Sequence, residues 1–503
     1  MRSTQERHES MKYVRRAFFM ATLGQYLSIV ISLSFIVVMS RMMAPTEIGL
    51  SVIGLSVTTM VFSLREFVAS DFLIQLDKVE PQDVCTARTV MVCFTCILAI
   101  GLFLASPWLA QFYENVSLKL FLWLTITAAV IESLAAPNLS LLRRDMQFGT
   151  VTLIDTVRLS VNAIATIGFA MLDWGFVSFA IGALVASIAS TALTLAARQL
   201  WWSFIPSFQS LPALTRFGRY RGATSVVDRL YDSLPMVMLG SIMSSAAVGR
   251  YNRSVTISNL PDKLVLSSVF SVAFPALAAG VRNNLDIKPS YLRALGFISA
   301  VYWPALLMVA IISDPIVRLV LGHGWEDVIP IARLLTLSSV FFFPVVLTYP
   351  LLIALNANRS AFAFNMISRV SSAAILCIAA FFGVTAIAAS QFISLPLQMV
   401  LCFIFVRRYI RFEWWDLYKA ILPSFLASLS AITGPLLVAA YLGFRFNFTA
   451  AETVLVCFLA IIGWFIGLKA TRHPILNEIN IVFTSIAERI RAWRPYLLKS
   501  AQR

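Results

Sequence analysis

Charged residues are scarce in this sequence. Asp, Glu, Lys and Arg make up 13% of its 503 residues, whereas hydrophobic residues make up 59%. An average soluble domain carries about a quarter of its residues as charges. The composition therefore excludes a soluble enzyme, a disordered chain and a coiled coil, and it leaves a membrane protein with many spans.

Histidine and cysteine are also few, and the motifs of common catalytic sites are missing. The three histidines lie outside the long apolar runs, and the single CxxC pair, Cys93 and Cys96, lies inside one without a second pair. A zinc or redox site is therefore not expected. No GxxxxGK[ST] or HExxH stretch occurs, and each would mark nucleotide or zinc chemistry. We expect no enzyme, no metal and no cofactor.

Long apolar runs fill most of the chain, and no loop between them could hold a soluble domain. A transmembrane helix needs about 20 apolar residues, and about fourteen runs reach that length. The sequence predicts an all-α polytopic membrane protein with about 14 transmembrane helices. The runs are roughly 17–39, 48–69, 89–110, 118–138, 151–172, 174–196, 222–244, 254–279, 292–313, 328–354, 361–383, 384–406, 419–442 and 451–470.

The basic residues lie mostly on one side of these runs. With the N-terminus placed in the cytoplasm, 28 Lys and Arg fall on that side and six on the other. This bias predicts cytoplasmic termini, and it explains the net charge of +15 as topology rather than as a nucleic-acid site. Residues 1–16 form a basic N-terminus. The pattern of apolar and basic residues in 474–503 predicts an amphipathic basic tail that lies on the inner leaflet. A helix that binds a soluble partner would have the same pattern.

A weak repeat divides the chain. The stretch around Gly49 resembles the stretch around Gly249, at an offset of 200 residues and six spans. The repeat predicts an N-lobe and a C-lobe of the same orientation around a central cavity. The N-lobe is 17–196 (spans 1–6), a cytoplasmic linker covers 197–221, the C-lobe is 222–406 (spans 7–12), and 419–470 adds spans 13 and 14.

Ionisable residues inside the spans are the candidate site, because they are costly in lipid and usually face a cavity. The basic ones are expected to form a cationic cavity for phosphate or pyrophosphate, with snorkelling to the interface as the alternative. They are Arg65, Arg158, Arg229, Lys263 and Arg369. The acidic ones are candidates for coupling to H⁺ or Na⁺, with neutralisation by a nearby arginine as the alternative. They are Asp155, Asp228, Asp232, Glu66 and Glu132.

Three stretches resemble the polysaccharide transporter family, the Wzx-type oligosaccharide flippases of bacterial inner membranes. They are 43–49 (MAPTEIG); 248–253 (VGRYNR) with 259–261 (NLP) and 272–277 (VAFPAL); and 320–330 (VLGHGWEDVIP). The resemblance implies the multidrug/oligosaccharidyl-lipid/polysaccharide exporter superfamily. It implies two six-helix lobes in a V around a cationic central cavity, with an extra helix pair that forms a groove for a lipid tail.

The same resemblance implies the activity and its setting. The expected cargo is an undecaprenyl-pyrophosphate-linked oligosaccharide, moved across the bacterial inner membrane by ion-coupled alternating access for exopolysaccharide or lipopolysaccharide synthesis. Expected partners are this lipid-linked oligosaccharide, membrane lipids, a polysaccharide polymerase and a chain-length regulator, and no nucleic acid.

Two other functions stay open at this point. A multidrug or small-molecule antiporter of the same superfamily would need an acidic, aromatic cavity. A membrane glycan polymerase or ligase would need a long outer loop with catalytic Arg or His, whereas all the outer loops here are short.

Overall fold

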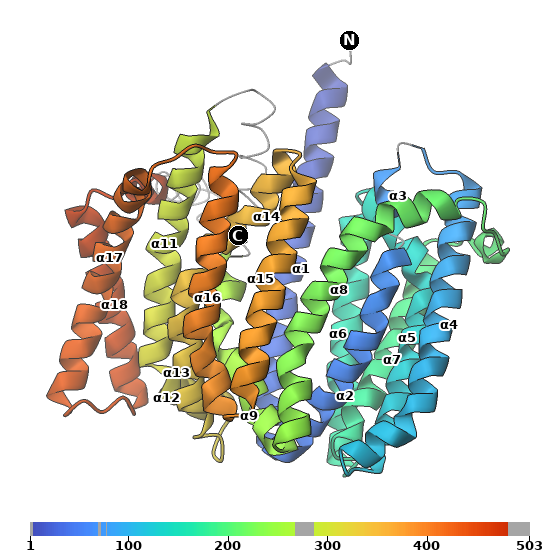
Figure 1. Ribbon diagram of the computed structural model, residues 1–503, viewed down its shortest axis with the longest axis horizontal. Helices are drawn as coiled ribbons and strands as arrows, with labels where there is room; N and C mark the ends of the chain where they lie inside the picture. The colour runs from blue at the N-terminus through green and yellow to red at the C-terminus, as the bar shows by residue number, and fades with distance from the viewer. Residues whose placement is uncertain (1–3, 69–71, 77, 267–285, 481–503) are drawn as a thin grey trace, which may run out of the picture. The chain divides into compact units, whose positions relative to one another are not determined.

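The computed structural model (Figure 1) describes residues 4–68, 72–76, 78–266 and 286–480, with side chains from Leu23 onward except those of 75, 216–221 and 264–265. All regular structure within these ranges is helical. The elements are α1 (Thr4–Met42), α2 (Pro45–Ser63), η1 (Leu64–Val68), α3 (Phe72–Gln75), α4 (Pro81–Phe112), α5 (Ser117–Arg144), α6 (Phe148–Met171), α7 (Val177–Ala197), η2 (Trp201–Phe204), α8 (Leu211–Ile242), α9 (Ser245–Ser258), η3 (Asp262–Leu266), α11 (Ile287–Ile311), α12 (Ser313–Val320), α13 (Val328–Ser338), η4 (Ser339–Phe342), α14 (Val345–Ala354), α15 (Asn358–Ala380), α16 (Val384–Arg407), α17 (Trp414–Tyr441) and α18 (Ala450–Ala470).

Twelve stretches of helix in the described residues are long and apolar enough to cross a membrane. They match twelve of the fourteen predicted spans. Of the other two, 222–244 overlaps α8, and the shared stretch carries three charges, Asp228, Arg229 and Asp232. The span 254–279 runs past residue 266 and lies partly outside the described residues. The chain is an all-α polytopic membrane protein.

The chain forms two compact units, and each is described here by itself. Unit 1 comprises Met1–Arg253, Arg318–Asp327 and Asn365–Ile387, and unit 2 comprises Ser254–Val317, Val328–Phe364 and Ala388–Arg503. Helix α8 belongs to unit 1 because it packs along α2 and η1. The lobes predicted from the repeat stay a prediction.

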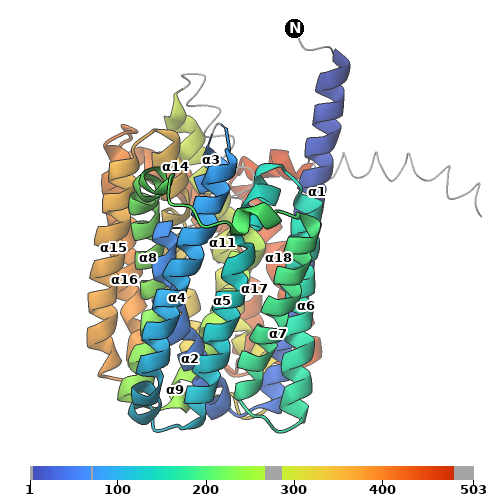
Figure 2. The same ribbon diagram turned by 90° about the vertical axis from the view of Figure 1, so that its right-hand side faces the viewer.

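Small residues set the helix packing in unit 1. Helices α4, α5, α7 and α6 stand side by side (Figure 2). A Cβ on Gly182 of α7 would lie 2.0 Å from Thr166 Oγ1 of α6, so the two helices touch there. Membrane helices lack a hydrophobic driving force toward each other, and close packing of small residues supplies the contact instead.

The two glycines of the repeat meet in space. A Cβ on Gly49 of α2 would lie 1.6 Å from the carbonyl oxygen of Ser245, and one on Gly249 of α9 would lie 2.1 Å from that of Pro45. Each glycine therefore faces the backbone of the first turn of the other helix. Such a reciprocal contact is what a local two-fold relation produces. The helix breaks also repeat: α1 ends at Met42 and α8 at Ile242.

Both helices of this contact lose α-helical geometry further along. Helix α2 continues into the 3₁₀ turn η1, and α9 is followed by η3, a π-helical turn. These turns lie within the predicted spans 48–69 and 254–279. Arg65 lies in η1 and Lys263 in η3, where a non-α turn redirects the side chains relative to the preceding helix.

Residues 321–327 form a turn anchored on α1 and α9 within unit 1. Trp325 is buried and donates through Nε1 to the carbonyl oxygen of Ser40, at 3.0 Å. Arg250 Nη1 lies 3.1 Å from Asp327 Oδ2. Gly322 and Gly324 have φ of +87° and +86°, a conformation that favours glycine. These contacts give a structural role to the stretch 320–330, which carries part of the family resemblance.

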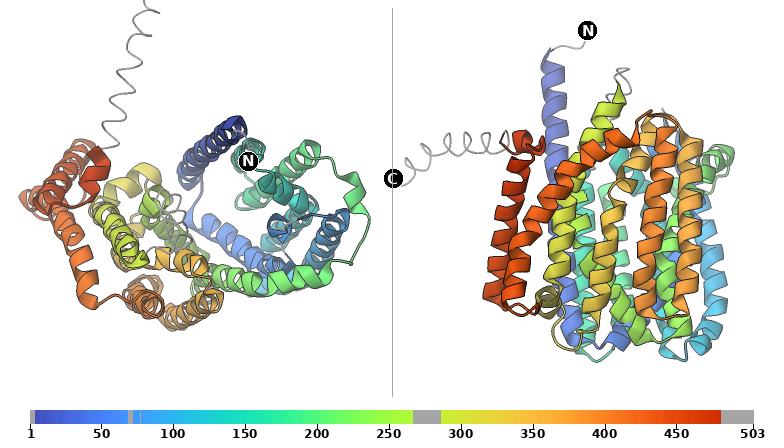
Figure 3. Two further views of the ribbon diagram at one scale, coloured as in Figure 1. Left: turned by 90° about the horizontal axis from the view of Figure 1, so that it is seen from above. Right: turned by 60° about the vertical axis from the view of Figure 1, so that its left-hand side comes forward.

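Helices α17 and α18 pack tightly against each other in unit 2 (Figure 3). A Cβ on Gly463 would lie 2.3 Å from the carbonyl oxygen of Ser430, whose hydroxyl donates to the carbonyl oxygen of Gly463. After α18, buried His473 accepts from the Ile475 N–H and lies 3.1 Å from Ser424 Oγ. Burial lowers the pKa of His473 below its ordinary value, because a buried ring is harder to charge. The predicted tail 474–503 lies mostly outside the described residues.

Candidate functional site

Two cavities of about 460 and 370 Å³ lie in unit 1, and every residue that lines them belongs to this unit. Five residues line both cavities, so the two spaces adjoin at these side chains, and all five are charged. They come from η1, α5, α6 and α8, and we call them the charged waist: Arg65, Glu66, Glu132, Arg158 and Arg229. All five were sequence candidates.

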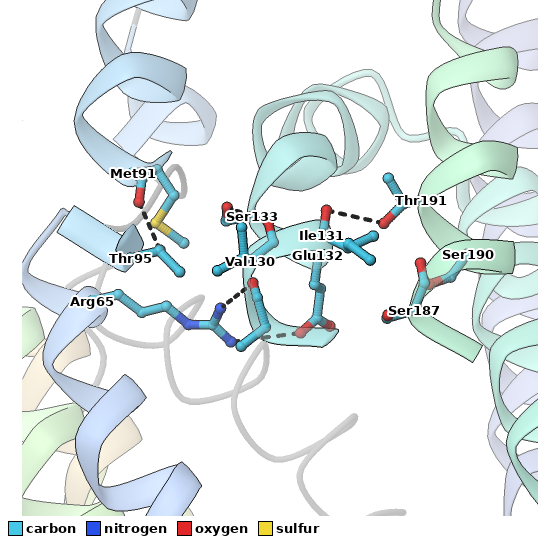
Figure 4. Close-up of polar contacts among 11 residues, drawn as sticks. Arg65, Met91, Thr95, Val130, Ile131, Glu132, Ser133, Ser187, Ser190 and Thr191 are labelled. Carbon is cyan, nitrogen blue, oxygen red and sulfur yellow. Dashed lines mark hydrogen bonds and ion pairs between the residues drawn. The ribbon is translucent and has the colours of Figure 1, made fainter. Parts of the chain in front are cut away.

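Arg65 reaches across from η1 to α5. Its Nη1 donates to the carbonyl oxygen of Ala129 at 3.4 Å, and its Nη2 lies 3.6 Å from Glu132 Oε2. Figure 4 shows the Glu132 carboxylate between Arg65 and the hydroxyls of α7. The Arg65 side chain is 22% exposed and that of Glu132 is 49% exposed. The pair is open enough to contact a ligand, and in that setting an ion pair contributes at most about 1 kcal/mol to stability.

The other waist residues are held less tightly. Arg158 Nη2 lies 3.8 Å from Asp155 Oδ1, one turn earlier on α6, and both side chains are more than a third exposed. Asp155 lines the second cavity. Neither Arg229 nor Glu66 forms an ion pair with any described residue. Three arginines and two glutamates leave the waist with a formal charge of +1, so it is weakly cationic, and one of its two glutamates, Glu132, is paired.

Sequence reasoning missed a polar face on α7. Ser187 lines the first cavity, and Ser190, Thr191 and Thr194 line the second. Their spacing of three, four and seven residues places them on one helix face, a signal that was available in the sequence. Each hydroxyl donates to a backbone carbonyl, as Thr191 does to Ile131 at 3.3 Å. Their oxygens therefore offer acceptor positions to a ligand.

Two further polar side chains were also missed. Asn162 lines the first cavity and Arg143 the second. Arg143 lies in the last turn of α5, where a basic residue is expected for topology alone. It adds a fourth arginine to the lining of the two cavities.

Arg369 pairs with Asp228 and lines neither cavity. Its Nε lies 2.9 Å from Asp228 Oδ1, and Asn365 donates to the same carboxylate at 3.2 Å. Asp228 thus has an arginine partner within unit 1, and its role in ion coupling stays a prediction. Asp232, one turn further along α8, forms no ion pair within the described ranges. Lys263 belongs to unit 2 and lines neither cavity.

Removing one partner of the Asp228–Arg369 pair should destabilise the protein. The carboxylate is 34% exposed and the guanidinium 23%, so Arg369→Gln should cost about 1–2 kcal/mol, between the values for exposed and buried pairs. Thermal unfolding in detergent measures the loss. The double variant with Asp228→Asn should recover part of it, and strictly additive losses would contradict a direct coupling.

The fold matches solved membrane transporters. A structure described as lipid II flippase MurJ, inward closed conformation, superposes with a TM-score of 0.74, at 16% identity over 91% of this chain and all of that one. An inward-facing multidrug resistance transporter of the MATE family, within the MOP superfamily, gives a TM-score of 0.63, at 15% identity over 77% of this chain and 94% of that one. At these identities the likeness shows the fold alone.

Two sequence relatives are named for the biosynthesis of lipopolysaccharide and of teichuronic acid. The lipopolysaccharide biosynthesis protein WzxC of Escherichia coli (strain K12) is 23% identical over 59% of this chain and 61% of its own length. The teichuronic acid biosynthesis protein TuaB of Bacillus subtilis (strain 168) is 23% identical over 53% of this chain and 56% of its own length. The chain thus spans little more than half the length of these relatives.

A family model described as polysaccharide biosynthesis protein matches residues 38–330, more than half of the chain. The match contains α2 to α9 and therefore all five residues of the charged waist. The chain belongs to the polysaccharide biosynthesis protein family.

Proposed function

We propose that the chain is a flippase that moves an undecaprenyl-pyrophosphate-linked oligosaccharide from the cytoplasmic to the periplasmic leaflet of the bacterial inner membrane. The observation that carries this is the charged waist, which places three arginines in a polar cavity of a chain from this family. Arginine binds phosphate in a bidentate manner, and a pyrophosphate between two cavities would meet several guanidinium groups at once.

The remaining lining suits the sugars. The hydroxyl oxygens on α7 and the side chain of Asn162 supply hydrogen-bond partners for sugar hydroxyls. The paired Glu132 can accept from them as well. A small-cation exporter would be better served by an acidic lining, and the surplus of arginine favours the anionic cargo.

The coupling and the setting belong to the same proposal. In this proposal the chain moves its cargo across the membrane without changing it chemically. Both termini lie in the cytoplasm, as the distribution of Lys and Arg favours. For coupling to H⁺ or Na⁺ we favour Asp232 over Asp228, because Arg369 already balances Asp228. Protein partners would be a polymerase and a chain-length regulator.

Deleting the gene tests the function directly. We expect complete lipid-linked repeat units to accumulate on the inner leaflet while surface polymer is lost, because synthesis continues without translocation. Mass spectrometry of extracted lipids and assay of surface polysaccharide measure the two effects, with the plasmid-borne gene as the control. Normal polymer with unchanged lipid intermediates would contradict the proposal and favour the drug-exporter alternative.

A further inference from the structure

The connection between α16 and α17 in unit 2 carries a dense group of exposed cations and aromatic rings. We call residues 407–419 the elbow; it follows the end of one candidate span and includes the start of the next. Its four cations are all exposed, as are four of its aromatic side chains. The cations are Arg407, Arg408, Arg411 and Lys419, and the exposed aromatic residues are Tyr409, Trp414, Trp415 and Tyr418.

Buried side chains hold the elbow in place. Ile410 and Phe412 alternate with exposed Arg411, and both belong to the hydrophobic core of unit 2. Two cations stack on neighbouring rings: Arg407 lies 5.5 Å from the ring centroid of Trp414, and Lys419 lies 5.3 Å from that of Trp415. The charged groups are thus presented on an ordered backbone.

The acidic residues of the elbow are already engaged. Glu413 and Asp416 cap the start of α17, where the Asp416 carboxylate accepts from the Glu413 N–H at 2.9 Å. Asp416 also lies 2.7 Å from Lys288 Nζ, at the start of α11. Arg407, Arg408 and Arg411 have no ion-pair partner among the residues that the structure describes. The elbow therefore keeps an uncompensated positive charge at one end of its spans.

We propose that the elbow binds the phosphate headgroups of anionic phospholipids. Its exposed rings have the amphipathic character of residues that sit at the headgroup level, with Trp414 51%, Trp415 58% and Tyr418 50% exposed. Clustered cations next to a membrane span attract acidic lipids. The elbow also joins α16 to the α17–α18 pair, so a lipid bound there contacts the junction of these elements (Figure 3).

Lipid binding can be measured without transport, which separates this proposal from the proposed function. The full chain in detergent is titrated with phosphatidylglycerol and, separately, with phosphatidylethanolamine, and bound lipids are counted by native mass spectrometry. The variant Arg407→Gln/Arg408→Gln/Arg411→Gln should bind phosphatidylglycerol about tenfold more weakly or worse, given the contribution of each cation near a membrane surface. Its binding of phosphatidylethanolamine should stay unchanged.

A matched control removes three exposed cations elsewhere in unit 2. The variant Arg359→Gln/Lys469→Gln/Arg472→Gln has the same net charge, and its binding of phosphatidylglycerol should fall by less than about threefold. Equal losses in the two variants would mean general electrostatic attraction and would overturn the elbow as a site. Unchanged lipid binding with lost polymer export would also overturn it and would assign the elbow to a protein partner.

Two more variants keep the test decisive if the triple variant loses stability. Replacing the three arginines by lysine preserves the charge and should preserve most of the binding of phosphatidylglycerol. Trp414→Leu/Trp415→Leu preserves every charge but removes the rings, and it should weaken that binding several-fold, since Arg407 and Lys419 lose the rings on which they stack. Full binding in the leucine variant would contradict the role of the rings.

Discussion

Replacing Gly49 with alanine should destabilise the protein by about 3 kcal/mol or more and lower the yield of folded protein. The added Cβ would lie 1.6 Å from the carbonyl oxygen of Ser245. A backbone atom cannot move aside as the end of a side chain can, so the first turns of α2 and α9 must separate. Overpacking usually costs about 1–3 kcal/mol where side chains can adjust. Thermal unfolding and gel filtration in detergent measure the effect, and Gly249→Ala should match it.

Glycines with open surroundings provide the control. A Cβ on Gly101 of α4 or Gly168 of α6 would meet nothing within 4 Å. In helices, alanine is favoured over glycine by up to about 1 kcal/mol, so Gly101→Ala and Gly168→Ala should be neutral or stabilising. The contact between the two repeats would lose its support if Gly49→Ala and Gly249→Ala behaved like these controls.

Replacing Arg65 with alanine should abolish polymer export while the protein is still expressed and folded. Arg65 is the waist residue that spans from η1 to α5, and its loss removes a guanidinium from both cavities. Hydrogen bonds to charged groups contribute about 1.5–3 kcal/mol, which corresponds to a loss of rate of tenfold or more. Arg65→Lys should retain part of the export, because it keeps the charge but loses the planar fork. Surface polymer and accumulated lipid-linked oligosaccharide are the measurements.

Exchanging the charges of Arg65 and Glu132 distinguishes two roles of Arg65: binding of the substrate, or only balancing the charge of Glu132. If Arg65 only balanced Glu132, then Arg65→Glu/Glu132→Arg would restore export; we expect it to remain inactive, because the cation has moved from η1 to α5. Arg445→Ala removes an exposed arginine that lines neither cavity, and it should export normally. Lys263→Ala changes the second basic residue at a non-α turn, which lines neither cavity, and it is compared with Arg65→Ala. Normal export by Arg65→Ala would contradict the assignment of the cavity.

The membrane fold could be predicted because hydrophobicity acts locally. A run of about 20 apolar residues is stable across a bilayer whatever its neighbours are, and twelve predicted spans have helical counterparts here. Span 7 was harder to assign, because α8 combines an apolar run with Asp228, Arg229 and Asp232. The charged candidates could also be found in advance, since an ionisable residue inside a span is rare and costly.

How those candidates group could not be predicted from their positions in the chain. Arg65, Glu132, Arg158 and Arg229 lie on four elements, and only the packing of these elements brings them to one waist. Arg369, like Arg158, is an arginine inside a predicted span, yet its position on α15 places it beside Asp228 rather than at the waist. Side-chain spacing within one helix predicts local pairs such as Asp155 and Arg158. It carries no information on partners more than one hundred residues away.

The sequence by itself determined that this is a polytopic helical membrane protein and which ionisable residues lie inside its spans at a cost in free energy. It also determined that the stretches around Gly49 and Gly249 are alike. Each of these follows from composition, periodicity or local likeness. Only the tertiary structure decided that the two glycines touch, that η1 turns Arg65 toward α5, and that Asp228 has an ion-pair partner whereas Asp232 has none among the described residues. The physical reason is that helix contacts and ion pairs depend on distances between segments, and those distances are set by packing rather than by order along the chain.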